Sequence, residues 1–369
     1  MGKLFEEKSI SSMVVKNRFV RSATWEGMAT PEGVMTDMLV QTIEELAKGE
    51  VGLIISGHTF VSPEGQASPL QLGVYDDSFI PGLKEMVDVA HNNGAKIVLQ
   101  LAHAGVHAPN PITNQFAFVI SDFPELGTMK REEMTEVDFK RLANAFGSAA
   151  KRAKEAGFDG VQMHAGHGYL LSQSLSNAYN KRDDSYGGSI ENRSRLLLEV
   201  YGKIREAVGK DYPVLIKMNS EDCIENGLKV EESLKVASML EAKGLDAVEL
   251  SGGTLTSGKL SPSRVGINKP EKEAYFQEAA KQFKNKLNIP VILVGGMRSF
   301  EKNEELVDDD VADFISMSRP FIREPQLIKR WKEGDLSRPK CLSDNLCFGP
   351  AMKGEGIRCV TEERQKAKE

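Results

Sequence analysis

The sequence predicts a single TIM (β/α)8 barrel, and three observations lead to that fold class. Short apolar runs alternate with longer amphipathic stretches along the chain, the pattern of repeated strand–helix units around a parallel sheet. Eight such runs can be counted, which matches the eight strands of the barrel. An open doubly wound sheet usually carries a glycine-rich phosphate fingerprint, GxGxxG, after its first strand. That fingerprint is missing here, where the first strand and the residues after it read FVRSATWEGMA.

The predicted strands are short and rich in apolar residues. They span residues 19–23, 51–56, 96–101, 160–165, 214–219, 247–251, 291–295 and 313–318. The stretches between them have apolar spacing near 3.6 residues, and several end in glycine after a basic last turn, as helix C-termini often do. They predict helices over residues 38–48, 79–94, 139–157, 192–209 and 230–244.

The chain is expected to fold as one barrel domain with two additions. A TIM barrel with insertions reaches 369 residues as a single unit, and no repeat or Pro/Ser-rich linker marks a boundary. Residues 105–134 form an insertion long enough to be a lid or a short hairpin over the site. We expect residues 1–340 to form the barrel and residues 341–369 to form a cysteine-containing extension that packs on it or trails from it.

Composition excludes several classes of function. Hydrophobic residues make up 40% and charged residues 27% of the chain, the balance of a soluble globular protein. The net charge of -6 is spread over mixed-sign helices, so no basic stripe indicates nucleic acid or anionic lipid. The start lacks a signal peptide, and no apolar run approaches the roughly 20 residues of a membrane helix. We expect a cytoplasmic protein without nucleic-acid or membrane partners.

Candidate site residues follow from one rule of the fold. In a TIM barrel the reactive residues lie at the C-terminal ends of the strands and in the loops that follow. All six histidines except His91 lie at or just beyond such an end. In chain order the candidates are Ser22, Ala23, Thr24, Trp25, His58, Gln100, His103, His164, His167, Tyr169, Lys217, Ser251, Gly295, Gly296, Ser318 and Arg319.

The last two loops predict a phosphate site. Gly295 and Gly296 follow the seventh strand, and adjacent glycines let backbone N–H groups approach an anion. Ser318 and Arg319 follow the eighth strand, where the guanidinium can bind phosphate oxygens through two hydrogen bonds. A Gly-Gly pair alone is equally consistent with a tight turn, but its place in the barrel favours phosphate binding.

The segment HAGHGY (residues 164–169) leaves three interpretations open. His164 and His167 could be hydrogen-bonded loop residues, or a metal pair, although HxxH here lacks the acidic residue of a zinc protease motif. The third interpretation is anion recognition with proton donation. Two imidazole N–H groups would polarise a carbonyl oxygen, and Tyr169 would deliver a proton because a phenol stays protonated at neutral pH.

Taken together, KNRFVRSAT, LIISGHTFVSPEGQ, LQLAHAG, HAGHGYLLSQSLSNAYNKRDDSYGGSIENRSR, VGGM and SMSRPFIREP resemble the old yellow enzymes. The resemblance covers about residues 4–330 in the expected order. It implies a barrel that binds FMN, takes reducing equivalents from NADH or NADPH, and reduces a small-molecule enone or enoate or a similarly activated alkene. It also allows a homo-oligomer, because small members of the family often form dimers or tetramers.

The resemblance implies roles for the candidate residues. His164 and His167 match the pair that binds the substrate carbonyl, and Tyr169 matches the donor of a proton to the α-carbon while flavin N5 gives hydride to the β-carbon. The flavin-contacting positions are matched by Ser22, Ala23, Thr24, Trp25, His58, Gln100, Lys217 and Ser251, with Gly295, Gly296, Ser318 and Arg319 on its phosphate. Lys217 would stabilise the anionic reduced flavin.

The chain departs from the family pattern in three places. Trp25 and His58 stand where relatives commonly carry smaller residues beside the flavin, so the shape of the pocket is open. In the C-terminal run CLSDNLCFGPAMKGEGIRC, Cys341, Cys347 and Cys359 keep three of the four iron–sulfur ligands of larger relatives, but Asp344 stands where the second cysteine would be. Because such clusters require thiolates, we expect no bound metal.

Two other functions stay open at this point. A metal-dependent barrel hydrolase would use His103, His164 and His167 as ligands. A flavoprotein electron carrier or diaphorase would bind FMN without reducing alkenes. The sequence does not decide between NADH and NADPH, and it does not name the physiological acceptor.

Overall fold

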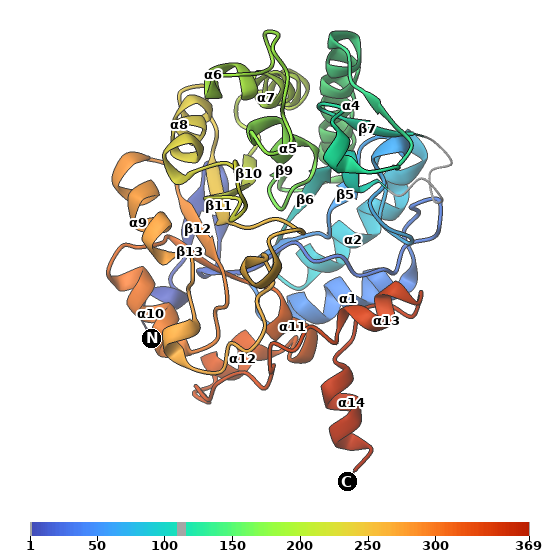
Figure 1. Ribbon diagram of the computed structural model, residues 1–369. Helices are drawn as coiled ribbons and strands as arrows, with labels where there is room; N and C mark the ends of the chain where they lie inside the picture. The colour runs from blue at the N-terminus through green and yellow to red at the C-terminus, as the bar shows by residue number, and fades with distance from the viewer. Residues whose placement is uncertain (1, 109–115, 369) are drawn as a thin grey trace.

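The wall of the molecule is a closed ring of parallel strands. The computed structural model describes residues 2–108 and 116–368. Within these residues eight parallel strands pair in the order β4, β3, β13, β12, β11, β10, β9, β6, and β6 pairs back onto β4 (Figure 1). The strands are β3 (Phe19–Arg21), β4 (Leu53–Ile55), β6 (Lys96–Ala102), β9 (Gly160–Ala165), β10 (Val214–Asn219), β11 (Ala247–Ser251), β12 (Val291–Val294) and β13 (Phe314–Met317). The predicted TIM barrel is confirmed.

Helices surround the ring on its outer side (Figure 1). The outer helices are α1 (Asp37–Lys48), α2 (Ile80–Asn92), α4 (Glu136–Ala156), α7 (Arg195–Val208), α8 (Val230–Glu241), α9 (Gln277–Lys286), α10 (Phe300–Asp308) and α12 (Leu327–Lys332). Shorter helices are α5 (Leu170–Leu175), α6 (Ile190–Arg193), α11 (Arg319–Arg323), α13 (Phe348–Met352) and α14 (Val360–Lys366). None of the helices in the described part of the chain combines the length and apolar character that crossing a bilayer requires.

Local signals set the helix boundaries. The longest outer helix, α4, begins with a capping box in which Thr135 and Asp138 satisfy each other's backbone N–H groups. It ends at Gly157, whose φ of 95° is left-handed and favours glycine. The single helix predicted over 192–209 is wrong, because Ser194 separates α6 from α7 and its hydroxyl donates to the carbonyl of Glu191 at 2.9 Å.

Alternation along the strands divides the barrel interior into layers. Successive side chains of a strand point to opposite faces. On β9, Val161 and Met163 pack in the outer core, so Gln162 and His164 face inward. The inner apolar layer belongs mostly to the first half of the strands, although Ile55 ends β4. It contains Val20, Leu53, Ile55, Val98, Leu215, Ala247, Ile292 and Phe314. Polar inward residues therefore gather at the carboxyl ends, where the candidate site lies.

A hairpin closes the opposite end of the barrel. Strands β1 (Lys8–Ile10) and β2 (Met13–Val15) pair antiparallel. Ile10, Met13 and Val15 belong to the same buried cluster as Leu215 and Phe314, near the starts of the barrel strands. The interior is thus open to ligands from the carboxyl end.

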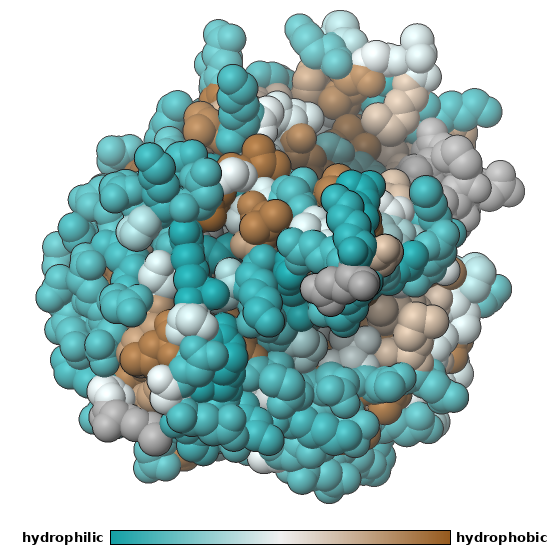
Figure 2. All heavy atoms as spheres, turned by 90° about the horizontal axis from the view of Figure 1, so that it is seen from below, coloured by the Kyte–Doolittle hydropathy of each residue, from teal (hydrophilic) through white to brown (hydrophobic). Residues whose placement is uncertain are grey.

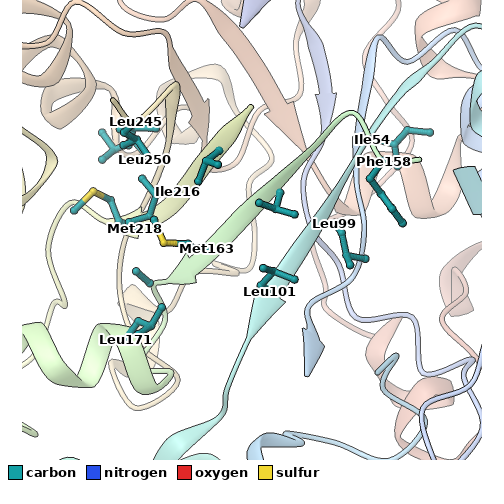
Figure 3. Packing of buried hydrophobic residues seen from close by; sticks show 14 of the residues in the cluster. Ile54, Leu99, Leu101, Phe158, Met163, Leu171, Ile216, Met218, Leu245 and Leu250 are labelled. Atoms are coloured by element: carbon teal, nitrogen blue, oxygen red, sulfur yellow. The ribbon is translucent and has the colours of Figure 1, made fainter. Parts of the chain in front are cut away.

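The outer core lies between the strands and the helices. Figure 3 shows part of this layer, with Leu99, Met163 and Ile216 on the neighbouring strands β6, β9 and β10. Each of these side chains is fully buried. Burying one such side chain contributes about 2 kcal/mol, so this layer fixes the strands that carry the site.

The insertion at residues 105–134 is not a hairpin. Strands β7 (Ala117–Val119) and β8 (Arg131–Glu133) pair in parallel, which corrects the hairpin prediction. Arg131 explains the crossover, because its guanidinium donates to the carbonyls of Phe123, Gly127 and Met129 and folds the connection back on itself. Residues 109–115 of the insertion lie outside the described residues.

The C-terminal extension packs on the barrel in its first part and trails from it in its last part. Ser343 accepts a hydrogen bond from the backbone of Gly266, so this segment packs against the barrel. Farther on, α14 projects away from the body of the protein (Figure 1). Figure 2, seen from below, shows that this face of the molecule is mostly hydrophilic. The division of the chain after residue 340 stays a prediction.

Candidate active site

A single cavity at the carboxyl ends of the strands brings the predicted residues together. Its volume is about 420 Å³, within the roughly 300–1,000 Å³ of small-molecule sites. It is lined by Ser22, Ala23, Thr24, Trp25, His58, Gln100, His164, His167, Tyr169, Lys217, Ser251, Gly296, Ser318 and Arg319. Gly295 does not line it, which corrects that position. None of the described residues of the insertion 105–134 lines it either, so the lid prediction has no support there.

The ring order places two kinds of chemistry on opposite walls. Strand β9 lies four places from β13 in the closed ring, so the two strands face each other across the barrel. His164 stands at the end of β9, and Ser318 follows β13. The histidine–tyrosine cluster therefore lies across the cavity from the predicted phosphate site.

Aromatic and imidazole rings cluster on the β9 wall. The ring centroid of His164 lies 5.1 Å from that of His167 and 4.8 Å from that of Tyr169. His58 adds a third imidazole, and its Nε2 lies 3.3 Å from the hydroxyl of Tyr169. The predicted segment therefore forms one compact cluster with a residue from the second strand's loop.

The backbone of this segment is held in an unusual conformation. His167 has a φ of 63°, in the left-handed region that few residues other than glycine adopt. The side chain of Asn219 accepts its backbone N–H at 3.0 Å and donates to Asp222 at 2.8 Å. The hydroxyl of Ser251 lies 2.8 Å from Nε2 of His167 and fixes the ring. Strain at this position is held by its neighbours, as is common at functional sites.

Burial keeps the whole cluster uncharged at neutral pH. It lowers the pKa of His58 to about 4, with Lys217 adding to the effect, and it lowers the pKa values of His164 and His167 well below the ordinary value of 6.5. Burial raises the pKa of Tyr169 to about 12. The histidines are therefore neutral hydrogen-bonding groups, and the tyrosine holds its proton.

A buried carboxylate that sequence reasoning missed organises the floor of the cavity. Glu249 is fully buried, accepts from Ser22 at 2.7 Å and from Ser316 at 2.8 Å, and lies 3.3 Å from the Lys217 ammonium. Burial acts to raise its pKa, but Lys217 and the hydrogen bonds lower it below its usual value. Gln162 donates to the same carboxylate and accepts from Gln100, which extends the network to the β6 wall.

Three arginines gather at the opposite end. Arg264, Arg298 and Arg319 have no carboxylate within ion-pair distance among residues 2–108 and 116–368. The Nε atoms of Arg264 and Arg298 are buried without a hydrogen-bond partner. Burial lowers the pKa of Arg298 to about 10, and the nearby charge of Arg319 acts in the same direction. An anion at this end would restore the missing partner.

The two glycines after β12 allow a close approach to an aromatic ring. Gly295 has a φ of 136°, and a Cβ atom there would lie 2.8 Å from the Phe276 ring. At Gly296, with a φ of 79°, a Cβ would lie 2.7 Å from the Tyr275 ring. Arg264 stacks on Tyr275, with its guanidinium carbon 4.2 Å from the ring centroid. The glycines therefore make room for the aromatic pair that supports the cationic end.

The C-terminal segment closes one side of the cavity. Asn345 and Phe348 line it, although the sequence indicated only a peripheral extension. Asn345 accepts from Arg319 at 2.6 Å and donates to the carbonyl of Ser263 at 2.8 Å. Trp25 also lines the cavity and packs on the cluster of Cys347, Ala351 and Ile357. Trp25 thus contacts both the cavity and the extension.

The described residues contain no group of three His, Cys, Asp or Glu side chains that could hold a metal ion. His103, required by the hydrolase hypothesis, does not line the cavity. Its Nδ1 accepts the backbone N–H of Gly105 at 3.1 Å, and its ring packs against Gly65. Asp344, in the cysteine-rich run, accepts from Thr361. The metal-dependent hydrolase therefore has no ligand set in this part of the chain.

The chain is similar to known proteins along most of its length. The model of the NADH:flavin oxidoreductase / NADH oxidase family matches residues 3–337. An NADH oxidase of Thermoanaerobacter brockii is 35% identical over 375 residues, which cover 97% of this chain and 55% of that protein. A 4,4'-dithiodibutanoate disulfide reductase of Rhodococcus erythropolis is 31% identical over 391 residues, which cover 98% of this chain and 95% of that protein.

Solved structures of two reductases also superpose on this chain. A 2-naphthoyl-CoA reductase in complex with 2-naphthoyl-CoA superposes with a TM-score of 0.89 at 28% identity, over 97% of this chain and 56% of that one. Morphinone reductase superposes with a TM-score of 0.78 at 25% identity, over 92% of this chain and 91% of that one. The chain thus spans about half the length of the NADH oxidase and of the 2-naphthoyl-CoA reductase, but nearly all of morphinone reductase.

Proposed function

This chain belongs to the NADH:flavin oxidoreductase / NADH oxidase family, and from that premise we propose that it is an oxidoreductase that uses a flavin and a nicotinamide. We propose that the flavin is FMN and that the enzyme reduces the C=C bond of α,β-unsaturated carbonyl compounds with NADH or NADPH. The observation that carries the proposal is the neutral, buried cluster of His164, His167 and Tyr169 on one wall of the cavity. This cluster offers carbonyl recognition and a proton in one place.

The residues around the cavity fit FMN. The guanidiniums of Arg298 and Arg319, which line the cavity without a carboxylate partner among the described residues, together with the turn at Gly296, suit a phosphate dianion. Gln100 and Lys217 supply polar groups for the pyrimidine edge of the ring, and Ala23, Met297 and Met317 supply apolar surface. Bound FMN supplies hydride from N5. The fit rests on these donors and on the volume of the cavity.

The protein's own part in the reaction is recognition and proton delivery. His164 and His167 hold the substrate carbonyl through neutral imidazole N–H groups and polarise the conjugated alkene. Tyr169 then protonates the α-carbon. Its elevated pKa keeps the proton available over the whole physiological pH range. The nicotinamide and the acceptor use the same cavity in turn, so we expect ping-pong kinetics.

A second acceptor class is favoured by one comparison. The disulfide reductase of Rhodococcus erythropolis matches this chain over 95% of its own length. The same cluster that protonates carbon could protonate a departing thiolate. Disulfide reduction is therefore the alternative, and electron transfer to a partner without a small-molecule product is a further one.

Anaerobic stopped-flow experiments test the proposal. The purified holoenzyme should be yellow, be bleached by NADH or NADPH, and recover its colour with an enone such as cyclohexenone. The acceptor panel includes enoates, nitroalkenes, enoyl thioesters and 4,4'-dithiodibutanoate. Bleaching followed by recovery only with the disulfide would overturn alkene reduction in favour of the alternative, and a colourless protein would overturn flavin chemistry altogether.

The variant Tyr169→Phe isolates proton donation. A general acid contributes roughly 10²- to 10⁴-fold, so alkene reduction should fall by about 100-fold while bleaching by the nicotinamide is nearly unchanged. Tyr75→Phe is the matched control, because that hydroxyl binds the carbonyl of Glu32 at an exposed position. Equal alkene rates in wild type and Tyr169→Phe would remove the proton-donor role.

A further inference from the structure

We propose that His58 is a positioning residue for the proton of Tyr169. In this arrangement the Nε2–H of His58 donates to the phenol oxygen, so that the Tyr169 proton points into the cavity. After the proton has left, the same hydrogen bond stabilises the tyrosinate. The inference rests on the proposed function and assigns His58 a role beyond lining the flavin.

The contact is direct. The hydroxyl of Tyr169 lies 3.3 Å from Nε2 of His58, and the two ring centroids are 5.4 Å apart with an interplanar angle of 76°. His58 is the one hydrogen-bond partner of that hydroxyl within the described residues. The backbone of His58 is held by Gln71, whose side chain donates to the His58 carbonyl at 3.0 Å.

The neighbouring rings do not offer the same contact. His164 lies 4.8 Å from Tyr169 between centroids but makes no hydrogen bond to it, and its Nδ1 is buried without a partner. His107 approaches Tyr169 from the insertion at 6.2 Å between centroids, also without a hydrogen bond. The geometry therefore singles out His58.

Burial makes such a donor necessary. The pKa of Tyr169, raised to about 12, means that a buried tyrosinate is costly. The groups that face His58 are His164, at 6.3 Å between centroids, and the charged Lys217. Burial, with Lys217 adding to the effect, lowers the pKa of His58 to about 4, so the ring is neutral, carries one proton and remains a donor rather than an acid.

The proton balance of the step is simple. The O–H bond of Tyr169 breaks, and the proton goes to the α-carbon of a substrate that receives hydride at its β-carbon. The alkene is thereby reduced by two electrons, and the negative charge remains on the phenol oxygen. The Nε2–H of His58 bonds that oxygen until solvent returns a proton to it.

The test compares two acceptors in the holoenzyme. An enone requires protonation at carbon, whereas a quinone takes its protons on oxygen from solvent. In His58→Phe the ratio of enone to quinone rates should fall by about tenfold, the size expected for one hydrogen bond to a charged oxygen. His58→Gln, which keeps an N–H donor, should restore part of that ratio. The double variant with Tyr169→Phe should be no slower on the enone than Tyr169→Phe alone.

A second measurement is independent of turnover. In holoenzyme labelled with 3-fluorotyrosine, the ¹⁹F resonance of residue 169, identified by its loss in Tyr169→Phe, reports the titration of that phenol. The midpoint of that titration should be higher in His58→Phe than in the wild type. In His58→Gln it should lie between the wild-type and the His58→Phe values. An unchanged midpoint, or an unchanged enone to quinone ratio, would overturn the inference. A wild-type enzyme that reduces quinones but no enone would overturn the proposed function, and the ¹⁹F titration would still decide the role of His58.

Discussion

Lys217 and Glu249 face each other in register on the adjacent strands β10 and β11. From the sequence, Lys217 is a free positive charge for a reduced flavin. In the structure it lies 3.3 Å from a fully buried carboxylate that Ser22 and Ser316 also bind. The charge that Lys217 would offer to a flavin is therefore partly compensated, and we expect Glu249 to set how much of that charge the flavin would experience.

Replacing Glu249 by Gln should raise the reduction potential of the bound flavin. The amide keeps the shape of the side chain but removes the negative charge beside Lys217, so the anionic reduced flavin is favoured. A change of about 1.4 kcal/mol corresponds to about 30 mV for a two-electron couple, and we expect a rise of that order. Equilibration with a reference dye measures it. A fall in potential would contradict the compensation argued here.

Ser251 should control how His167 binds a carbonyl. If the Ser251 hydroxyl donates to Nε2, the ring proton stays on Nδ1 and is free for the substrate. Losing one hydrogen bond of about 1 kcal/mol predicts a roughly fivefold higher KM for cyclohexenone in Ser251→Ala, with a smaller change in kcat. Ser12→Ala, on the distant hairpin, is the control. Equal KM values in the two variants would exclude a role for Ser251 in orienting the ring.

At the scale of elements, hydrophobic periodicity predicted the regular barrel strands. It did not predict the fold of the insertion, which depends on specific side-chain contacts. Strands β9, β10 and β11 begin and end where the sequence predicts, because each is a buried run with polar or glycine residues at its ends. The insertion was misjudged because the fold of its connection depends on one side chain, Arg131, that bonds to several carbonyls of the preceding loop. No periodic pattern encodes such contacts.

The candidate site shows the same division. The candidate residues at strand ends were found by the barrel rule alone, and all except His103 and Gly295 line the cavity. Glu249 was missed although a signal existed, since a charged residue stands two places before Ser251 and must face the same interior. Asn345 and Phe348 gave no signal, because only the folded chain brings them back to the barrel.

The turn after β12 gives a test at this scale. In Gly295→Ala the new Cβ would lie 2.8 Å from the Phe276 ring at a φ of 136°, so we expect a loss of stability of about 1–3 kcal/mol and weaker FMN binding. Gly202→Ala in α7 is the matched control, because nothing lies within 4 Å of its Cβ. That variant should gain about 0.5–1 kcal/mol. Urea unfolding and flavin titration measure both. Similar stability in the two variants would show that the turn tolerates a side chain.

At the scale of the whole molecule, the buried histidines make stability depend on pH. Burial lowers the pKa values of His58, His103 and His107 to about 4. In the unfolded chain their pKa values are near 6.5, so between pH 6.5 and 4 the unfolded state binds more protons than the folded state. Stability is therefore lost as the pH falls through this window, and it is retained above it.

By pH 4, each of these histidines should lower the free energy of unfolding by on the order of 3 kcal/mol relative to neutral pH. His107→Gln removes one of them without touching the cavity wall, so its free energy of unfolding should fall less steeply between pH 6.5 and 4 than that of the wild type. The measurement is urea unfolding at a fixed excess of FMN across this range. Parallel curves for the two proteins would contradict the burial argument for His107.

The position of Asn345 and Phe348 also has a consequence for biosynthesis. A ribosome makes the chain from its amino end, so Ser22 and Trp25 leave the exit tunnel long before these two residues. The barrel strands can assemble first, but Asn345 cannot accept its hydrogen bond from Arg319 until the segment has emerged. We therefore expect tight capture of a flavin to be one of the last events in maturation, so that a nascent chain stalled shortly before this segment would be folded but colourless.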